Sequence, residues 1–155
     1  MSMQTPTLHG PGEGDWYQFL AGRNRVLAGR KATDGAMSII EFEAPPGFGP
    51  PPHIHRIEDE MFYVLEGSAS FWCDNEEVTY EAGGFCWLPK GLPHRFEMGP
   101  EGGRILQITT PAQFEDMVAD YGFPIAADEH PEPEPPDVAR LVEVCQRYQI
   151  DLLLP

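Results

Sequence analysis

Short apolar segments, separated by turn residues, fill the first two-thirds of the chain. The segments are rich in β-branched and aromatic residues, and Gly, Pro, Asn and Asp stand between them. Many short strands at this spacing are typical of an all-β sandwich or barrel. The expected strands are 16–20, 25–29, 37–42, 61–65, 69–73, 78–80, 85–88, 94–98 and 105–109.

The pattern changes to helical spacing after Thr110. Thr110, Pro111 and Gln113 have the form of an N-cap, a first helical residue and a capping-box residue. Gly122 is a candidate C-cap for this helix. The apolar residues that follow at helical spacing are Phe114, Met117, Val118 and Tyr121.

An acidic, proline-rich stretch at 126–136 predicts an extended linker, and Asp137 is the expected N-cap of a second helix. Its apolar face comprises Val138, Leu141, Val142, Cys145 and Tyr148. The predicted organisation is therefore a flexible N-terminal arm at 1–14, an all-β barrel at 15–110 and a C-terminal helical extension at 111–155.

Composition narrows the possible partners. The formal net charge is −15 over 155 residues, which disfavours binding to nucleic acid or to anionic membrane surfaces. Residues 1–14 carry no secretory signal, and no stretch approaches the roughly 20 apolar residues of a membrane span. The three cysteines form no CxxC motif, so no disulfide framework is expected. A cytoplasmic protein is predicted.

Four residues form a candidate metal site. His53 and His55 make a His-x-His pair that an extended segment points to one face. Glu60 opens the next strand, and His94 comes from a separate hairpin. Three imidazoles and one carboxylate suit Fe, Mn, Ni, Co, Cu or Zn as a divalent ion, and contain too much nitrogen for Mg²⁺ or Ca²⁺. Two positions of an octahedral ion would remain for water, substrate or O₂.

The spacing of these residues resembles the two signatures of the cupin superfamily. The first, G(x)5HxH(x)4E(x)6G, is matched by Gly47, His53, His55, Glu60 and Gly67. The second, G(x)5PxG(x)2H(x)3N, is matched by Gly83, Pro89, Gly91 and His94.

The resemblance covers roughly 16–110, and the helical tail is similar to that of single-domain cupins of the quercetin dioxygenase kind. It implies a double-stranded β-helix, or jelly-roll, barrel with His53, His55, Glu60 and His94 as ligands of one divalent metal. Asp59 is an alternative to Glu60, because the family tolerates a shorter gap, and residue type favours Glu60.

The last signature position, usually Asn, is Met98. Strand alternation places Phe62, Val64, Phe96 and Met98 inward, so these residues are the expected pocket lining. An apolar pocket around an open metal site favours an aromatic or otherwise apolar substrate.

The expected function is that of a metal-dependent dioxygenase acting on a small aromatic or enolisable substrate, with Glu60 as general base. The alternatives are a redox-neutral isomerase, cyclase or decarboxylase, which uses the metal as a Lewis acid, and a non-enzymatic ligand-binding cupin. A homodimer is also expected, because barrel edges need cover. Its candidate interface comprises 16–20, 25–29 and the apolar 152–154.

Overall fold

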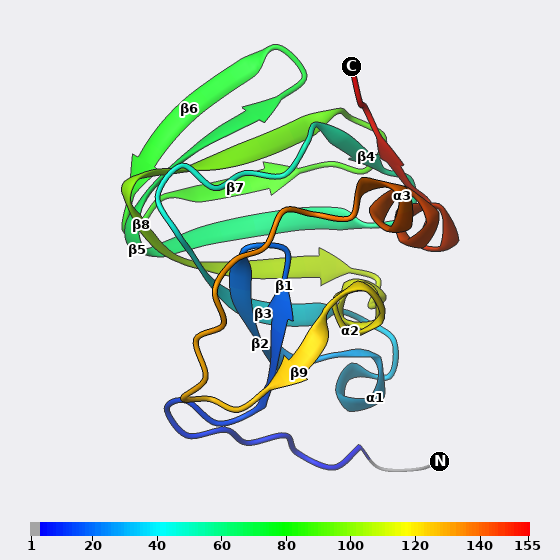
Figure 1. Ribbon diagram of the computed structural model, residues 1–155. Coiled ribbons are helices and arrows are strands. Elements are labelled where there is room, and N and C mark those ends of the chain that lie inside the picture. Colours follow the sequence, from blue (N-terminus) through cyan, green and yellow to red (C-terminus); the bar gives the residue numbers. More distant parts are fainter. Residues whose placement is uncertain (1–3) are drawn as a thin grey trace.

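The computed structural model describes residues 4–155, so the first three residues of the expected arm at 1–14 lie outside the described residues. Antiparallel strands form two facing layers that join along one side (Figure 1). The strands are β1 Asp15–Phe19, β2 Gly22–Ala28, β3 Ser38–Ala44, β4 His53–His55, β5 Asp59–Cys73, β6 Glu76–Glu81, β7 Phe85–Leu88, β8 His94–Thr110, β9 Phe123–Ile125 and β10 Ile150–Leu152. The predicted all-β cupin barrel is confirmed.

The two long strands β5 and β8 hold the layers together. They pair with each other over most of their length, β5 also pairs with β6 and β7, and β8 also pairs with β3 and β4. The sequence predicted four separate strands here, which is wrong. Gly67 adopts a positive φ and packs so closely on Gly102 that a Cβ would clash with its carbonyl oxygen. The glycines therefore bend and bulge continuous strands instead of reversing the chain.

Two apolar clusters form the interior. One fills the barrel and is rich in aromatic rings, with Phe42, Phe62, Phe71 and Phe96 in edge-on or tilted contact. The other lies between the barrel and the helices and is built around Val118 and Val144, both fully buried. The second cluster joins the C-terminal extension to the barrel.

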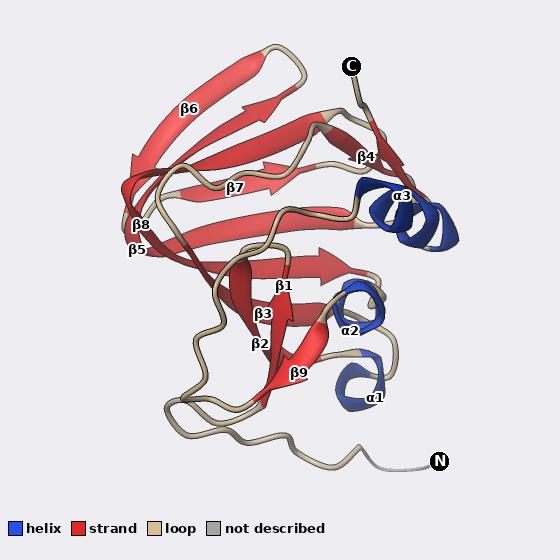
Figure 2. Ribbon diagram, viewed as in Figure 1, coloured by secondary structure: helices blue, strands red, loops and turns tan. Residues whose placement is uncertain are grey.

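The helices α1 Arg30–Thr33, α2 Phe114–Tyr121 and α3 Val138–Arg147 lie at the right of the view, opposite the side on which β5 and β8 are labelled (Figure 2). The predicted start of α2 is wrong: Gln113 is its N-cap, because Thr110 still pairs with Asp59 as the last residue of β8. The predicted caps Gly122 and Asp137 are confirmed, the latter accepting a hydrogen bond from the backbone N–H of Arg140.

The apolar face of α3 differs from the expected one in two positions. Leu141, Val144 and Cys145 are buried, whereas Val138, counted in the predicted face, is exposed and Val144 was not counted. Val138 shares the helical face of Leu141 and Cys145, but it is the first residue after the N-cap Asp137 and lies at the exposed end of the helix.

Two short strands of the extension, which the sequence did not predict, extend the sheet. β9 pairs with β1, and β10 pairs with β4, the strand that carries the His-x-His pair. Segment 16–20, a candidate dimer interface, is thus covered by β9, whereas Leu153 and Leu154 remain exposed. Dimerisation stays a prediction. Within residues 4–155, no helix has the length and apolar character needed to span a membrane.

Candidate metal centre

Three strands bring the four expected ligands together. His53 and His55 lie on β4, Glu60 near the start of β5 and His94 at the start of β8, where it pairs with His53 across the sheet. One side-chain donor atom from each of the four residues lies within 4.8 Å of the others. The ring centroids of His53 and His94 are 4.5 Å apart, and those of His55 and His94 are 5.3 Å apart.

Glu60 is the acidic member of this cluster. Its Oε2 lies 2.7 Å from Nε2 of His94 and 3.3 Å from Nε2 of His55. Its Oε1 accepts a hydrogen bond from the side-chain amide of Gln107. The alternative ligand Asp59 is directed elsewhere, since its Oδ1 accepts a hydrogen bond of 3.0 Å from the backbone N–H of Lys90.

The Nδ1 atom of each imidazole faces an oxygen that only accepts hydrogen bonds. The Nδ1 partners are the carbonyl of Pro51 at 2.8 Å for His53, Oε2 of Glu58 at 3.1 Å for His55, and the carbonyl of Leu92 at 3.3 Å for His94. With Nδ1 donating to these oxygens, Nε2 of each ring is the nitrogen that a metal would bind.

The charges in the cluster are strongly coupled. Burial raises the pKa of Glu60, but His55 and His94 outweigh it and hold that pKa well below its ordinary value. Burial lowers the pKa of His55, yet the Glu60 and Glu58 carboxylates raise it to about 10. Burial and the two neighbouring imidazoles lower the pKa of His53 to about 3. In the metal-free protein, one imidazolium thus lies among carboxylates beside a neutral imidazole.

These residues fit a divalent transition metal. Nε2 of His55 is buried and makes no well-formed hydrogen bond, since its contact with Oε2 of Glu60 is an ion-pair distance of 3.3 Å, although buried polar atoms in folded proteins nearly always have a hydrogen-bond partner. Three imidazole nitrogens and one carboxylate oxygen are a donor set that such ions accept. A metal at this point would give that nitrogen a partner and replace the proton between His55 and Glu60.

A mostly apolar cavity opens beside the cluster, between the barrel and the helical extension. Its lining includes His53, His55, Glu60 and Gln107. The apolar part of the lining comes from the barrel, from α2 and α3 and from β10, with Phe19, Phe42, Phe48, Phe96, Phe114, Met117, Leu141 and Ile150.

Only one of the four expected pocket residues lines this cavity. Phe96 does, whereas Phe62, Val64 and Met98 are at most 2% exposed and lie within the barrel core. The prediction that Met98 adds surface to the pocket is wrong. Strand alternation gives the direction of a side chain but not its depth, and the barrel beneath the metal centre is filled with side chains.

Two polar residues of the site were missed by sequence reasoning. Glu58 is fully buried and binds His55, and Gln107 is buried and binds Glu60. A signal existed for Gln107, because it lies two residues from Ile105 and from Thr109 and therefore shares their buried face of the strand. Glu58 lies in the loop before β5, where no periodicity indicates its direction.

Comparison with known proteins agrees with this geometry. Residues 40–108 match the cupin domain family. A Bacillus subtilis protein named quercetin 2,3-dioxygenase is 27% identical over 147 residues, which cover 93% of this chain and 43% of that protein. An uncharacterized protein of Methanocaldococcus jannaschii is 32% identical over 60 residues, which cover 39% of this chain and 48% of that protein. The chain thus spans less than half the length of these relatives.

Solved structures with low sequence identity share the fold. The structure of KdgF from Halomonas sp. aligns with a TM-score of 0.65 and 16% identity, covering 72% of this chain and 99% of the other. An RmlC-like cupin from Shewanella frigidimarina aligns with a TM-score of 0.63 and 18% identity, covering 74% and 99%. The segment 40–108, the barrel fold and the two spaced signatures make this chain similar to cupin-domain proteins.

Proposed function

We propose that this chain binds one divalent transition metal through His53, His55, Glu60 and His94 and acts as a dioxygenase-type oxidoreductase on a small aromatic or enolisable substrate. The observation that carries the proposal is a donor set of three imidazoles and one carboxylate at the wall of an apolar cavity. When bound there, such an ion supplies Lewis acidity and open coordination positions for substrate and O₂.

The cavity lining accounts for the proposed class of substrate. Phe48, Phe96 and Phe114 offer ring faces and edges to a flat apolar molecule beside the metal ligands. Water has little polar surface to bind in this part of the cavity. An aromatic or enolic group would therefore gain from leaving water, while its hydroxyl points to the polar wall.

Glu60 and Gln107 form that polar wall. The low pKa of Glu60 keeps it a carboxylate at neutral pH, and the amide of Gln107 holds one of its oxygens in place. The other oxygen faces the imidazoles and would ligate the metal; on partial release from the ion it would accept the proton of the substrate hydroxyl. The named activity of the B. subtilis relative supports oxygenase chemistry, and the short coverage of that protein makes this a proposal for the present chain.

Elemental analysis tests the metal site first. Protein purified without chelators or a histidine tag is compared with a His53→Ala/His94→Ala double variant, both after soaking with divalent ions. Near-stoichiometric Fe, Mn, Ni, Co or Cu in the wild type alone supports the site. Absence of metal from the soaked wild type refutes it.

Oxygen uptake tests the chemistry. The metal-loaded protein is incubated with aromatic diols and flavonols in air and under nitrogen, with Glu60→Gln as the matched variant. Substrate-dependent O₂ consumption that Glu60→Gln abolishes supports the proposal. Product formation under nitrogen contradicts it and indicates a redox-neutral metal reaction. Full turnover by Glu60→Gln contradicts the role of that carboxylate as a base.

A further inference from the structure

The three imidazoles of the centre are oriented in different ways. His53 and His94 each contact a backbone carbonyl two residues earlier in their own segment. His55 instead contacts the side chain of Glu58, which is fully buried. The orientation of His55 therefore depends on whatever holds Glu58.

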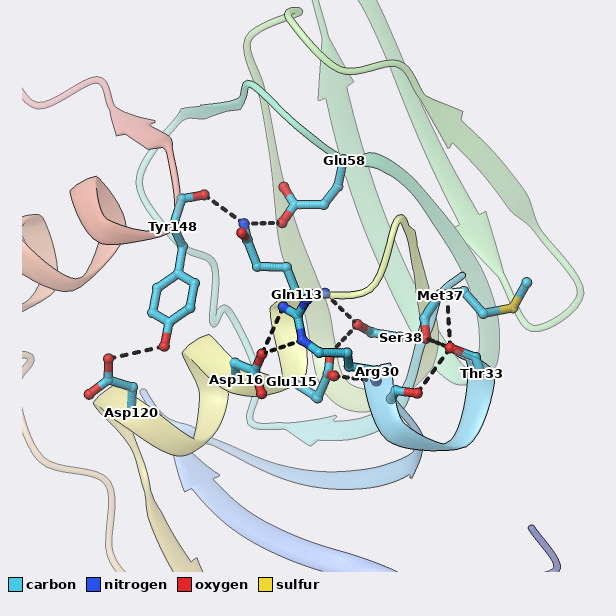
Figure 3. A network of polar contacts seen from close by, with 11 residues as sticks. Arg30, Thr33, Met37, Ser38, Glu58, Gln113, Glu115, Asp116, Asp120 and Tyr148 are labelled. Carbon is cyan, nitrogen blue, oxygen red and sulfur yellow. Dashed lines mark hydrogen bonds and ion pairs between the residues drawn. The ribbon is translucent and has the colours of Figure 1, made fainter. Parts of the chain in front are cut away.

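Gln113 holds the other oxygen of Glu58. Figure 3 shows the amide of Gln113 between Glu58 and the backbone carbonyl of Tyr148. Its Nε2 donates to Oε1 of Glu58 at 2.7 Å and to the carbonyl of Tyr148 at 2.8 Å, so both of its protons are used. The backbone N–H of Gln113 donates to Oγ of Ser38 on β3, which ties this residue to the barrel.

This amide joins both helices of the extension to the metal centre. Gln113 is the N-cap of α2, and Tyr148 is the C-cap of α3. The phenol of Tyr148 also donates to Oδ2 of Asp120 on α2 at 3.1 Å (Figure 3). The two helix ends are thus fixed relative to each other at the point where Gln113 contacts Glu58.

The backbone makes a second connection at the same place. β10 follows α3 directly, and Ile150 pairs with His55 in the antiparallel register of β10 and β4. The backbone N–H of Arg56 donates to the carbonyl of Gln149 at 3.1 Å. The C-terminal extension therefore contacts His55 in two ways. Strand β10 pairs with its backbone, and Gln113 reaches its side chain through Glu58.

We propose that Glu58 and Gln113 are positioning residues of the metal centre, which hold the imidazole of His55 with Nε2 toward the metal and make the extension from α2 to β10 a part of the site. The inference rests on the proposed metal site, and not on oxygenase chemistry. It names a role for two side chains that contact neither metal nor substrate.

The carboxylate of Glu58 is suited to this role because its two oxygens accept two hydrogen bonds at once. In Glu58→Gln, one oxygen is replaced by an NH₂ group that would face either Nδ1–H of His55 or the NH₂ of Gln113. One of the two acceptor oxygens, and with it one of the two hydrogen bonds, is then lost without a change in side-chain size. Removal of such outer partners of metal-binding histidines typically weakens metal affinity by about 10–100-fold.

Co²⁺ binding tests the proposal. Co²⁺ affinity is measured by competition with a coloured chelator, and the visible absorption spectrum of the bound ion reports ligand geometry. The proteins are the wild type, Glu58→Gln, Gln113→Ala and Glu77→Gln, a control at an exposed position on β6. Far-ultraviolet circular dichroism checks that each is folded.

We expect Glu58→Gln to bind Co²⁺ about 10–100-fold more weakly and with an altered spectrum. Gln113→Ala should show a smaller loss in the same direction, and Glu77→Gln no change. Unchanged affinity and spectrum in a folded Glu58→Gln would overturn the proposal. Should that variant fail to fold, unchanged values in Gln113→Ala would overturn it equally.

The outcomes separate this inference from the proposed function. A wild type that takes up no Co²⁺ overturns the metal site and this inference together. The wild type could bind Co²⁺, and Glu58→Gln bind it more weakly, while no substrate causes O₂ uptake. That outcome supports the positioning role and contradicts only the proposed oxygenase activity.

Discussion

Metal binding should release a proton from His55. In the metal-free protein, burial lowers the pKa of this imidazole, but the carboxylates of Glu60 and Glu58, 3.3 Å and 3.1 Å away, raise it to about 10. At neutral pH the ring is therefore almost fully protonated on both nitrogens. A metal can bind Nε2 only after the proton on Nε2 leaves. The proton on Nδ1 remains there, hydrogen-bonded to Glu58. His53 contributes no proton, because its pKa of about 3 leaves it neutral.

The magnitude follows from the position of that pKa. Deprotonation of His55 should release about one proton per ion and tighten the apparent Kd about tenfold for each pH unit between roughly 7 and 9. The gain should level off near pH 10, where the metal-free ring loses its proton unaided. The direction is toward tighter binding at higher pH, since protons compete with the metal.

Isothermal titration calorimetry measures this release directly. The same metal is titrated into metal-free protein in buffers of different ionisation enthalpy at one neutral pH, and the slope of observed enthalpy against buffer enthalpy gives the protons released. A second series follows Kd across the pH range with a metal that stays soluble. A slope near zero, together with a pH-independent Kd, would refute the reasoning and show that His55 is neutral before the metal binds.

The remaining predictions concern stability, measured by urea unfolding of the metal-free protein. Its free energy of unfolding should fall as pH drops from about 6.5 to about 3, because the unfolded chain protonates His53 and the folded chain does not; an equal fall in His53→Asn would contradict this. Gln107→Leu leaves the buried carboxylate of Glu60 without its donor and should cost about 1–3 kcal/mol, so an unchanged midpoint would count against that hydrogen bond. Ile105→Ala in the fully buried barrel core should lower the free energy of unfolding by about 2–5 kcal/mol. A smaller loss would indicate that the core collapses into the space left by the deleted side chain. Asp137→Ala removes the side-chain cap of α3 and should cost about 1 kcal/mol, which Asp137→Asn should largely restore.

Local pattern was enough for most of the fold. Alternating apolar residues indicated nearly every strand of the barrel, and Asp137 and Gly122 marked helix ends correctly. The errors lie where long-range pairing overrides a local signal. The bulges at Gly67 and the pairing of Thr110 with Asp59 depend on the partner strand, which no local window contains.

What the sequence determined by itself is the candidate donor set. Strand alternation puts His53 and His55 on one face, and the resemblance to the two cupin signatures adds Glu60 and His94, so all four donors can be named from the chain alone.

Only the tertiary structure decided what surrounds those donors. Alternation gives the side of a strand on which a residue lies, but not whether it reaches a cavity or lies in a filled core, as Phe96 and Met98 show. The partners of the donors come from distant parts of the chain, with Gln107 beside Glu60 and Gln113 beside Glu58. A hydrogen bond between residues more than 40 positions apart depends on packing of the whole fold, because nothing in either local sequence specifies the other.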